Sequence, residues 1–87
     1  MGFSDALRMR VKDRANFTCC WCRVQQNFVE IHHIVPEAQG GSDTEDNAAP
    51  LCSGCHTLYG GNPDLRKEIA GRRDNWYRLC EKEHALI

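Results

Sequence analysis

The stretch EIHHIVPEAQGGSDTEDNAAPLCSGCH, residues Glu30–His56, decides the fold of this 87-residue chain. It begins with an apolar segment that carries two adjacent histidines, His32 and His33. A glycine-containing loop follows, then Asn47, and a Cys-x-x-Cys-His sequence ends at His56. An isolated His-His pair is more often structural, because successive residues of a strand point to opposite faces. The third histidine and the asparagine in the same stretch favour a functional site here.

Two Cys-x-x-Cys pairs predict a metal site. Zinc prefers four tetrahedral thiolate or imidazole ligands, and each pair supplies two of them from one tight turn. The expected ligands of a structural Zn²⁺ are Cys19, Cys22, Cys52 and Cys55. The two-residue spacing leaves out Cys20, and Cys80 is interpreted as a small buried residue. Four cysteines leave no open coordination position for catalysis, so any chemistry must lie elsewhere.

Length and composition predict a single domain over residues 1–87. A chain this small buries a modest core and commonly needs a staple such as a structural metal. No apolar run is long enough to span a bilayer, and the N-terminus lacks the apolar core of a signal peptide. We therefore expect a cytoplasmic protein without membrane contact. Thiols stay reduced in that compartment, which favours metal binding over disulfides.

Periodicity and capping signals predict an α+β fold. Ser4 is expected to cap a helix that runs to about Ala15, because apolar residues recur there at helical spacing. Strands are expected over about 28–34, before Pro36, and in a short segment at 48–51. A short helix is predicted over about 53–61. Asn62-Pro63 then predicts the start of a helix that continues to about residue 86.

The segment HHIVPEAQGGSDTEDNAAPLCSGCH resembles the HNH nuclease motif, also called ββα-metal, in which a strand, a Gly-containing loop and a helix carry the motif residues. The resemblance covers residues 19–61 and includes the two cysteine knuckles that many members have. It implies a small zinc-stapled, treble-clef-like ββα-metal core with flanking N- and C-terminal helices. The activity it implies is hydrolysis of DNA phosphodiester bonds with a divalent ion, leaving 5′-phosphate and 3′-hydroxyl ends.

The resemblance also implies roles for four residues. His33 corresponds to the general base that activates water, and His32 and His56 correspond to the protein ligands of a catalytic ion. A regular strand would splay the two adjacent rings, so we expect distortion at residues 32–34. Asn47 corresponds to the central Asn, which bonds backbone near His33 and orients the base. The commonest pattern has Asp where this chain has His32. Histidine is a softer, neutral ligand, which favours Mn²⁺, Co²⁺, Ni²⁺ or Zn²⁺ relative to Mg²⁺.

DNA is the expected partner. Arginines meet phosphates without reading sequence, so we expect weak sequence specificity and cleavage of one strand by the one active site of a monomer or weak dimer. The candidate phosphate contacts are Arg8, Arg10, Arg14, Arg66, Arg72 and Arg73. Trp76 is interpreted as a core residue because it is in helical phase with Ile69.

Two other functions compete with this interpretation. A non-catalytic, zinc-stapled nucleic-acid-binding module needs the cysteines and the arginines, but it gives no reason for three histidines and Asn47 in one stretch. A redox protein that uses Cys-x-x-Cys fits less well, since two knuckles with histidines match metal binding better.

Overall fold

The computed structural model describes residues 2–25 and 28–85. The principal elements are α1 (Asp5–Arg14), β1 (Val29–His33), β2 (Ala48–Cys52), α2 (Ser53–Cys55), the π-helical segment η3 (His56–Gly60) and α3 (Arg66–Ala85). Single 3₁₀ turns lie at η1 (Glu37–Gln39), η2 (Glu45–Asn47) and η4 (Pro63–Leu65). The predicted α+β fold is confirmed. Residue 86, where the last helix was expected to end, lies outside the described residues.

Both predicted helix starts are present. The side chain of Ser4 accepts a hydrogen bond from the backbone N–H of Leu7 at 3.1 Å, which satisfies one of the free donors in the first turn of α1. The side chain of Asn62 does the same for Asp64 at 3.0 Å, with Pro63 in the first position. The turn that Asn62 caps is 3₁₀, and α3 takes over from it at Arg66.

The two strands pair antiparallel, and this pairing places the histidines. In the register, His32 lies opposite Ala49 and His33 lies opposite Ala48. Every residue of β2 is buried, whereas β1 is only partly buried. Both histidines thus have an alanine as their paired neighbour on β2.

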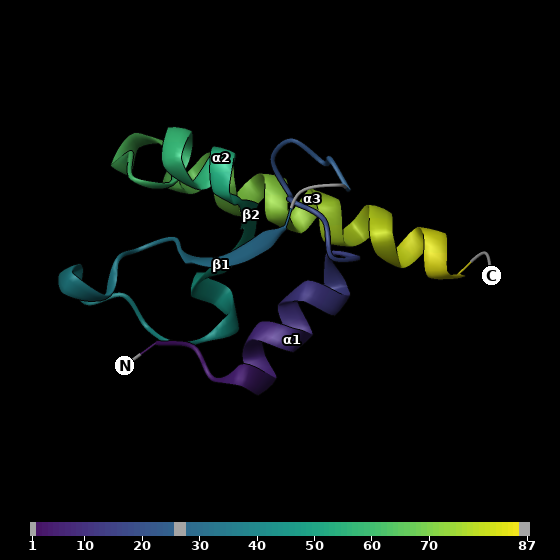
Figure 1. Cartoon of the computed structure of the whole chain (residues 1–87), viewed down its shortest axis with the longest axis horizontal. Coiled ribbons are helices and arrows are strands. Elements are labelled where there is room, and N and C mark those ends of the chain that lie inside the picture. Colours follow the sequence, from purple (N-terminus) through teal and green to yellow (C-terminus); the bar gives the residue numbers. More distant parts are fainter. Residues whose placement is uncertain (1, 26–27, 86–87) are drawn as a thin grey trace.

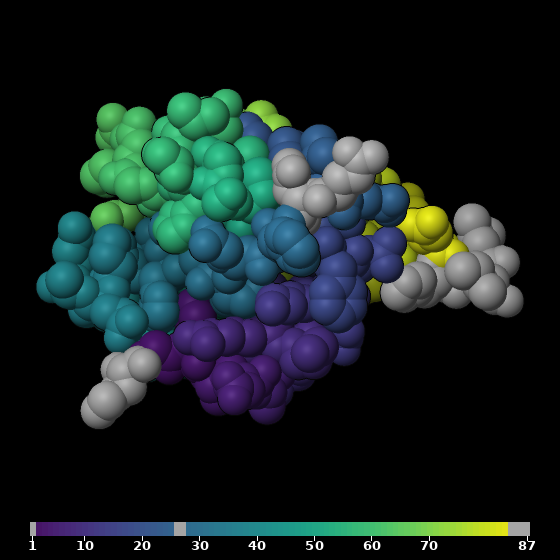
Figure 2. Space-filling view, in the orientation of Figure 1, coloured from purple at the N-terminus to yellow at the C-terminus, as the bar shows by residue number. Residues whose placement is uncertain are grey.

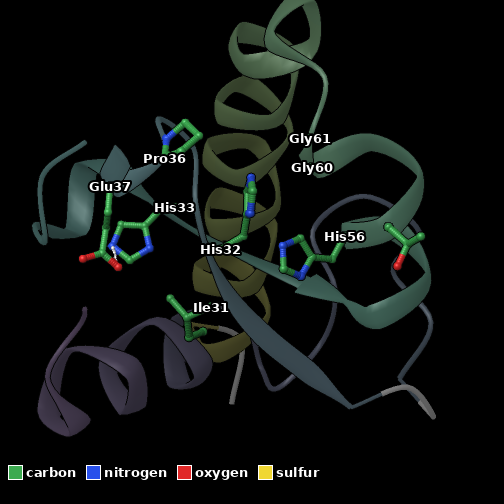
Figure 3. A pocket seen from close by; sticks show the side chains of 9 residues that line it. Ile31, His32, His33, Pro36, Glu37, His56, Gly60 and Gly61 are labelled. Carbon is green, nitrogen blue, oxygen red and sulfur yellow. Dashed lines mark ion pairs between the residues drawn. The ribbon is translucent and has the colours of Figure 1, made fainter. Parts of the chain in front are cut away.

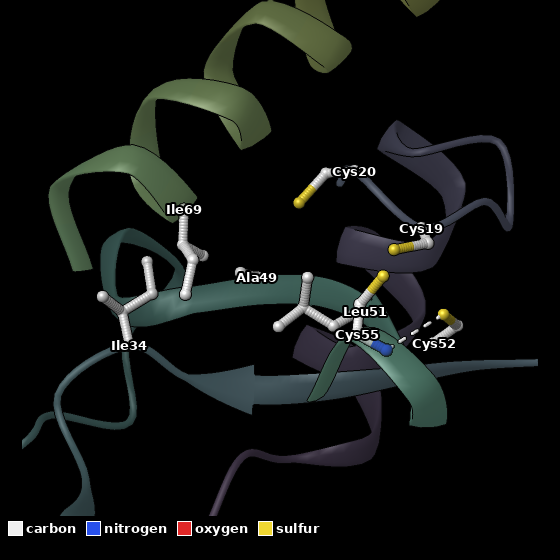
Figure 4. Packing of buried hydrophobic residues seen from close by; sticks show 8 residues of the cluster. All are labelled: Cys19, Cys20, Ile34, Ala49, Leu51, Cys52, Cys55 and Ile69. Atoms are coloured by element: carbon white, nitrogen blue, oxygen red, sulfur yellow. Dashed lines mark hydrogen bonds between the residues drawn. The ribbon is translucent and has the colours of Figure 1, made fainter. Parts of the chain in front are cut away.

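Two clusters of buried residues hold the helices to the sheet. One joins the cysteine knuckles to β2 and α3, and its members are Cys19, Cys20, Ile34, Ala49, Leu51, Cys52, Cys55 and Ile69 (Figure 4). The other lies beneath α1 and consists of Phe3, Leu7, Val11, Ala15, Ala48 and Tyr77. Trp76 packs against both clusters and donates its indole N–H to the carbonyl of Ala15 at 2.8 Å. Its expected core position is confirmed.

The helices are arranged around the sheet with the π-helical segment at one end (Figure 1). Helix α1 lies along one side of the sheet, and α3 passes behind it. In Figure 2, α1 and the segment after β2 occupy opposite sides of the visible face, with β1 and its following loop between them. Across residues 2–25 and 28–85, no helix has the length and apolar character needed to cross a membrane.

Candidate active site

The four predicted zinc ligands converge on one point. The sulfurs of Cys19, Cys22, Cys52 and Cys55 all lie within 4.8 Å of one another. Zn–S bonds of about 2.3 Å in a tetrahedron place neighbouring sulfurs about 3.8 Å apart. The Sγ atoms of Cys22 and Cys52 are 3.8 Å apart, so the cluster fits a structural zinc ion.

Backbone hydrogen bonds shape each knuckle. The N–H of Trp21 donates to Sγ of Cys19, and the N–H of Cys55 donates to Sγ of Cys52, both at 3.4 Å. Cys20 is buried outside the cluster, and this burial raises the pKa of its thiol to about 12. Cys20 therefore stays a neutral, inert thiol, and Cys80 is buried as expected.

The three histidines of the quoted stretch line one cleft of about 450 Å³. The cleft is bounded by the end of β1, the turn after it and the π-helical segment. In Figure 3, His32 stands between the other two rings, with His33 on the side of Glu37 and His56 on the opposite side. The structure thus brings together the three histidines that were predicted to do the chemistry, but not Asn47.

His32 has the features of a metal ligand. The residue is 7% exposed, and within the described part of the chain its Nε2 is buried without a hydrogen-bond partner. Burial, reinforced by the neighbouring His56 and His33, lowers the pKa of His32 to about 4. A neutral imidazole with a free nitrogen costs free energy when it is buried unpaired, and metal coordination removes that cost.

His56 is held in the orientation that suits a second ligand. Its ring centroid lies 4.7 Å from that of His32 in an edge-on arrangement. Its Nδ1 lies 3.0 Å from a carboxylate oxygen of Glu30. A carboxylate on one ring nitrogen fixes the tautomer and leaves Nε2 for a metal.

His33 faces a different set of neighbours. Its Nε2 lies 2.8 Å from Oδ1 of Asp43 and 3.8 Å from a carboxylate oxygen of Glu37. Its ring is stacked on that of Phe3, with centroids 3.8 Å apart and planes 12° from parallel. Sequence reasoning expected distortion at residues 32–34 so that both rings share one site. The strand instead pairs regularly through His33, and the bend begins at Ile34.

Asn47 holds that bend closed. Its side-chain oxygen accepts from the N–H of Val35 at 2.8 Å, and its amide donates to the carbonyls of Val35 at 3.0 Å and Ser42 at 2.9 Å. The side chain thus ties the turn after His33 to the end of the loop. The family resemblance implied backbone contacts near His33 for Asn47, and none of the observed contacts involves a residue that lines the cleft.

Gly60 lies close to two histidine rings, and its lack of a side chain lets them converge. A Cβ on Gly60 would lie 2.8 Å from Cδ2 of His56 and 3.1 Å from Cε1 of His32. The contact at 2.8 Å would force the His56 ring to move, and the contact at 3.1 Å would press on the buried ring of His32. The last residue of the π-helical segment therefore has to be glycine if both rings are to keep their positions.

We predict that Gly60→Ala lowers the affinity for a divalent ion at the histidine pair by about 10–100-fold, the range typical of groups that support metal ligands. Gly61→Ala is the matched control, because a Cβ on Gly61 meets nothing within 4 Å. Titration of both zinc-loaded variants with Mn²⁺ measures the difference. Equal Mn²⁺ affinity in the two variants would contradict this account of Gly60.

Several of the arginines proposed to meet DNA are paired on the surface. Arg10 and Arg14, both on α1, form ion pairs with Glu45. Arg66 donates to the side chain of Gln39 at 2.8 Å. Exposed ion pairs are weak, so these side chains remain able to exchange their partners for phosphate.

Two further arginines of that set, one on α3 and one on α1, also have acidic neighbours. Arg72 pairs with Glu68 at 2.9 Å, and its guanidinium stacks 4.1 Å from the ring centroid of Trp21. Arg8 lies 3.9 Å from a carboxylate oxygen of Asp5, and both side chains are half or more exposed.

Arg73 has a structural position, which corrects its inclusion among the phosphate contacts. The residue is 8% exposed, and one guanidinium nitrogen donates to the carbonyls of Asp46 at 2.7 Å and Ala48 at 3.2 Å. Its Nε donates to Asp74 at 2.9 Å. These bonds tie α3 to the start of β2, and they leave the charge little access to a phosphate. Helical phase alone did not separate Arg73 from its exposed neighbour Arg72.

Sequence reasoning missed four residues that contact or crowd the three histidine rings. Glu30 shares a strand face with His32, two residues away, so strand alternation was the available signal for it. Asp43 lies in the quoted loop but carries no spacing signal toward His33. Phe3 and Gly60 act through tertiary proximity, and no local pattern in the sequence points to either of them.

Parts of the chain match a family model and two known proteins. A family model described as HNH endonuclease matches residues 18–61, just over half of the chain. The type IV methyl-directed restriction enzyme EcoKMcrA of Escherichia coli (strain K12) is 48% identical over 29 residues, which are 33% of this chain and 10% of that protein. Anaredoxin of Nostoc sp. (strain PCC 7120 / SAG 25.82 / UTEX 2576) is 34% identical over 50 residues, 58% of this chain and 66% of that protein. The chain thus spans a tenth of the first relative's length and just under two thirds of the second's.

Proposed function

Because the chain belongs to the HNH endonuclease family, we propose that it is a metal-dependent DNA endonuclease that hydrolyses phosphodiester bonds in the histidine cleft. The observation that carries the proposal is the buried Nε2 of His32, which lies beside His56 and has no hydrogen-bond partner among the described residues. A non-catalytic, zinc-stapled binding module does not require a buried ring nitrogen that is free to bind a metal. The four-cysteine cluster lies apart from this pair and shares no ligand with it.

The donor set of the cleft fits a catalytic divalent ion. His32 and His56 would hold it, and two protein ligands leave coordination positions for phosphate and water. Imidazoles suit Mn²⁺ and Ni²⁺, while Mg²⁺ prefers oxygen ligands and is the weaker match. When bound, the ion supplies charge stabilisation for the phosphoryl oxygens and for the leaving 3′-oxygen.

His33 performs the proton transfer in this mechanism. Its Nε2 lies against Asp43, so that nitrogen carries the ring hydrogen and Nδ1 keeps a lone pair. In Figure 3 this second nitrogen lies on the side of the ring toward His32. Nδ1 takes a proton from water as the water oxygen attacks phosphorus. The bond to the 3′-oxygen breaks with its electron pair on that oxygen, which then takes a proton from solvent water. The products are a 5′-phosphate and a 3′-hydroxyl.

Asn47 acts on this step through the backbone. Its three hydrogen bonds fix the bend that follows His33, so the strand end keeps the base over the cleft. The residue touches neither the ion nor the substrate in this proposal. Glu30 orients His56 through the contact between its carboxylate and Nδ1 of that ring.

The remaining features of the proposal concern DNA and location. Arg8, Arg10, Arg14, Arg66 and Arg72 contact phosphates, so binding depends on salt and is weakly specific for sequence. One active site per chain nicks one strand, and the protein acts in the cytoplasm as a monomer or weak dimer. The relatives do not define the DNA substrate, since the restriction enzyme aligns over 29 residues only.

The test uses supercoiled plasmid incubated with zinc-loaded protein in Mg²⁺, Mn²⁺, Ni²⁺ or EDTA. We expect open circles to form with Mn²⁺ or Ni²⁺, more slowly with Mg²⁺, and not with EDTA. DNA ligase should reseal the nicks, because it requires a 5′-phosphate and a 3′-hydroxyl. Binding of plasmid without cleavage in any metal would replace the nuclease with the zinc-stapled binding module.

A further inference from the structure

Phe3 reaches the base from outside the region that the family model matches. The matched region begins at residue 18, whereas Phe3 belongs to the segment that precedes α1. Its side chain is 5% exposed and packs with Leu7 and Val11 in the cluster beneath α1. The next residue, Ser4, caps the helix, which fixes the direction of the chain at this point. Packing in this cluster thus holds Phe3 in place while its ring covers His33.

Two contacts restrain the His33 ring in different directions. Phe3 lies flat against one face of the ring at 3.8 Å, and Asp43 meets its edge at Nε2 at 2.8 Å. The backbone of Gly2, beside Phe3, also hydrogen-bonds to Asp43, so the N-terminal segment supports both contacts. The hydrogen bond from His33 keeps the pKa of Asp43 below its usual range, and its carboxylate stays an acceptor.

Free histidine rings do not hold one orientation. The outer side-chain torsion of histidine is broad and roughly two-fold, so a ring flip exchanges each nitrogen with a ring carbon. Such a flip turns Nδ1 away from the cleft even when the backbone is unchanged. Catalytic side chains need their rotamers locked by packing and by supporting hydrogen bonds.

We propose that Phe3 is a positioning residue for the general base: its stacked ring, together with Asp43, holds His33 with Nδ1 toward the cleft. The inference rests on the proposed nuclease function and extends it to a segment outside the family match. The N-terminal segment is then part of the active site and not only a flanking helix start.

The kinetic test compares Phe3→Leu, Phe3→Tyr and Val11→Ala in plasmid nicking with Mn²⁺. Phe3→Leu keeps apolar volume but removes the flat ring, and we expect kcat to fall about 10–100-fold with little change in KM, as for a misplaced reacting group. Phe3→Tyr restores the ring and should restore kcat. Val11→Ala disturbs the same cluster without touching His33, so it should lower Tm and leave kcat near the wild-type value. All assays run well below the lowest Tm.

A spectroscopic readout tests the stack without relying on activity. The ring protons of His33 should show an upfield shift from the Phe3 ring in wild-type NMR spectra, and this shift should vanish in Phe3→Leu and persist in Phe3→Tyr. The ring nitrogens should report hydrogen on Nε2.

The possible results separate the two proposals. Unchanged His33 ring resonances in Phe3→Leu would overturn the stack, and wild-type kcat in that variant would overturn the positioning role while the nuclease stands. A fall in kcat that matches the Val11→Ala variant would reduce Phe3 to a stability residue. Absence of cleavage by the wild-type protein would instead remove the proposed function, and the positioning role with it.

Discussion

Replacement of His33 by alanine is expected to reduce the rate of plasmid nicking by about 10²–10⁴-fold, the contribution typical of a general base. The reason is that Nδ1 of His33 is the proton acceptor in the proposed step, whereas His32 and His56 are assigned to the ion. Single-turnover nicking with Mn²⁺ measures the loss. Zinc content and circular dichroism of the variant should match the wild type, because His33 lies outside the cysteine cluster.

A second variant separates the loss of the base from a loss of packing. His33→Ala leaves Phe3 and Asp43 without their contact, so part of its effect reflects a local rearrangement. His33→Gln keeps a polar hydrogen-bonding side chain but cannot take a proton at neutral pH. Both variants should be equally inactive. Substantial nicking by His33→Gln would mean that another group, or water alone, accepts the proton.

Removal of zinc from the four-cysteine cluster is expected to unfold the chain. Structural zinc contributes about 10–16 kcal/mol of binding free energy in small zinc domains, which reaches or exceeds the whole stability of a typical domain, about 5–15 kcal/mol. Three of the cluster's cysteines are also members of the larger core cluster, so the metal and the core are coupled: Cys19, Cys52 and Cys55. Chelation followed by circular dichroism measures the effect.

Cys52→Ala and Cys80→Ala form a matched pair for this prediction. Both cysteines are buried, at 4% and 2% exposure, but only Cys52 belongs to the metal cluster. We expect Cys52→Ala to lose zinc and helical signal, and Cys80→Ala to retain both with a modest drop in Tm. A chelated wild-type protein with native circular dichroism would show that the core folds without the metal.

Local chemistry made much of the fold predictable. Ser4 and Asn62 predict helix starts because their side chains satisfy donors that the first turn leaves free. Alternation and β-branched residues place the strand that carries the histidines. The spacing of the cysteines predicts their convergence because a tetrahedral ion tolerates few arrangements. In each case the residues that carry the signal lie next to the structure they determine.

The parts that escaped prediction depend on contacts between distant residues. The stack of Phe3 on His33 joins two segments that pairing and helix packing bring together. The tight approach of Gly60 to His32 exists only once the π-helical segment lies against β1. Arg73 illustrates the same limit, since its burial follows from carbonyls at the start of β2 that no helical periodicity reveals.

The most direct test of the central claim is a Mn²⁺ titration of the zinc-loaded protein, followed by electron paramagnetic resonance. We predict one bound Mn²⁺ beyond the zinc, lost in His56→Ala and retained in His33→Ala. That result places the catalytic ion at the pair of His32 and His56, with His33 free to act as base. Retention in His56→Ala with loss in His33→Ala would place the ion at the other group of ligand atoms, His33 with Glu37 and Asp43, and would contradict the account, as would the absence of any second site.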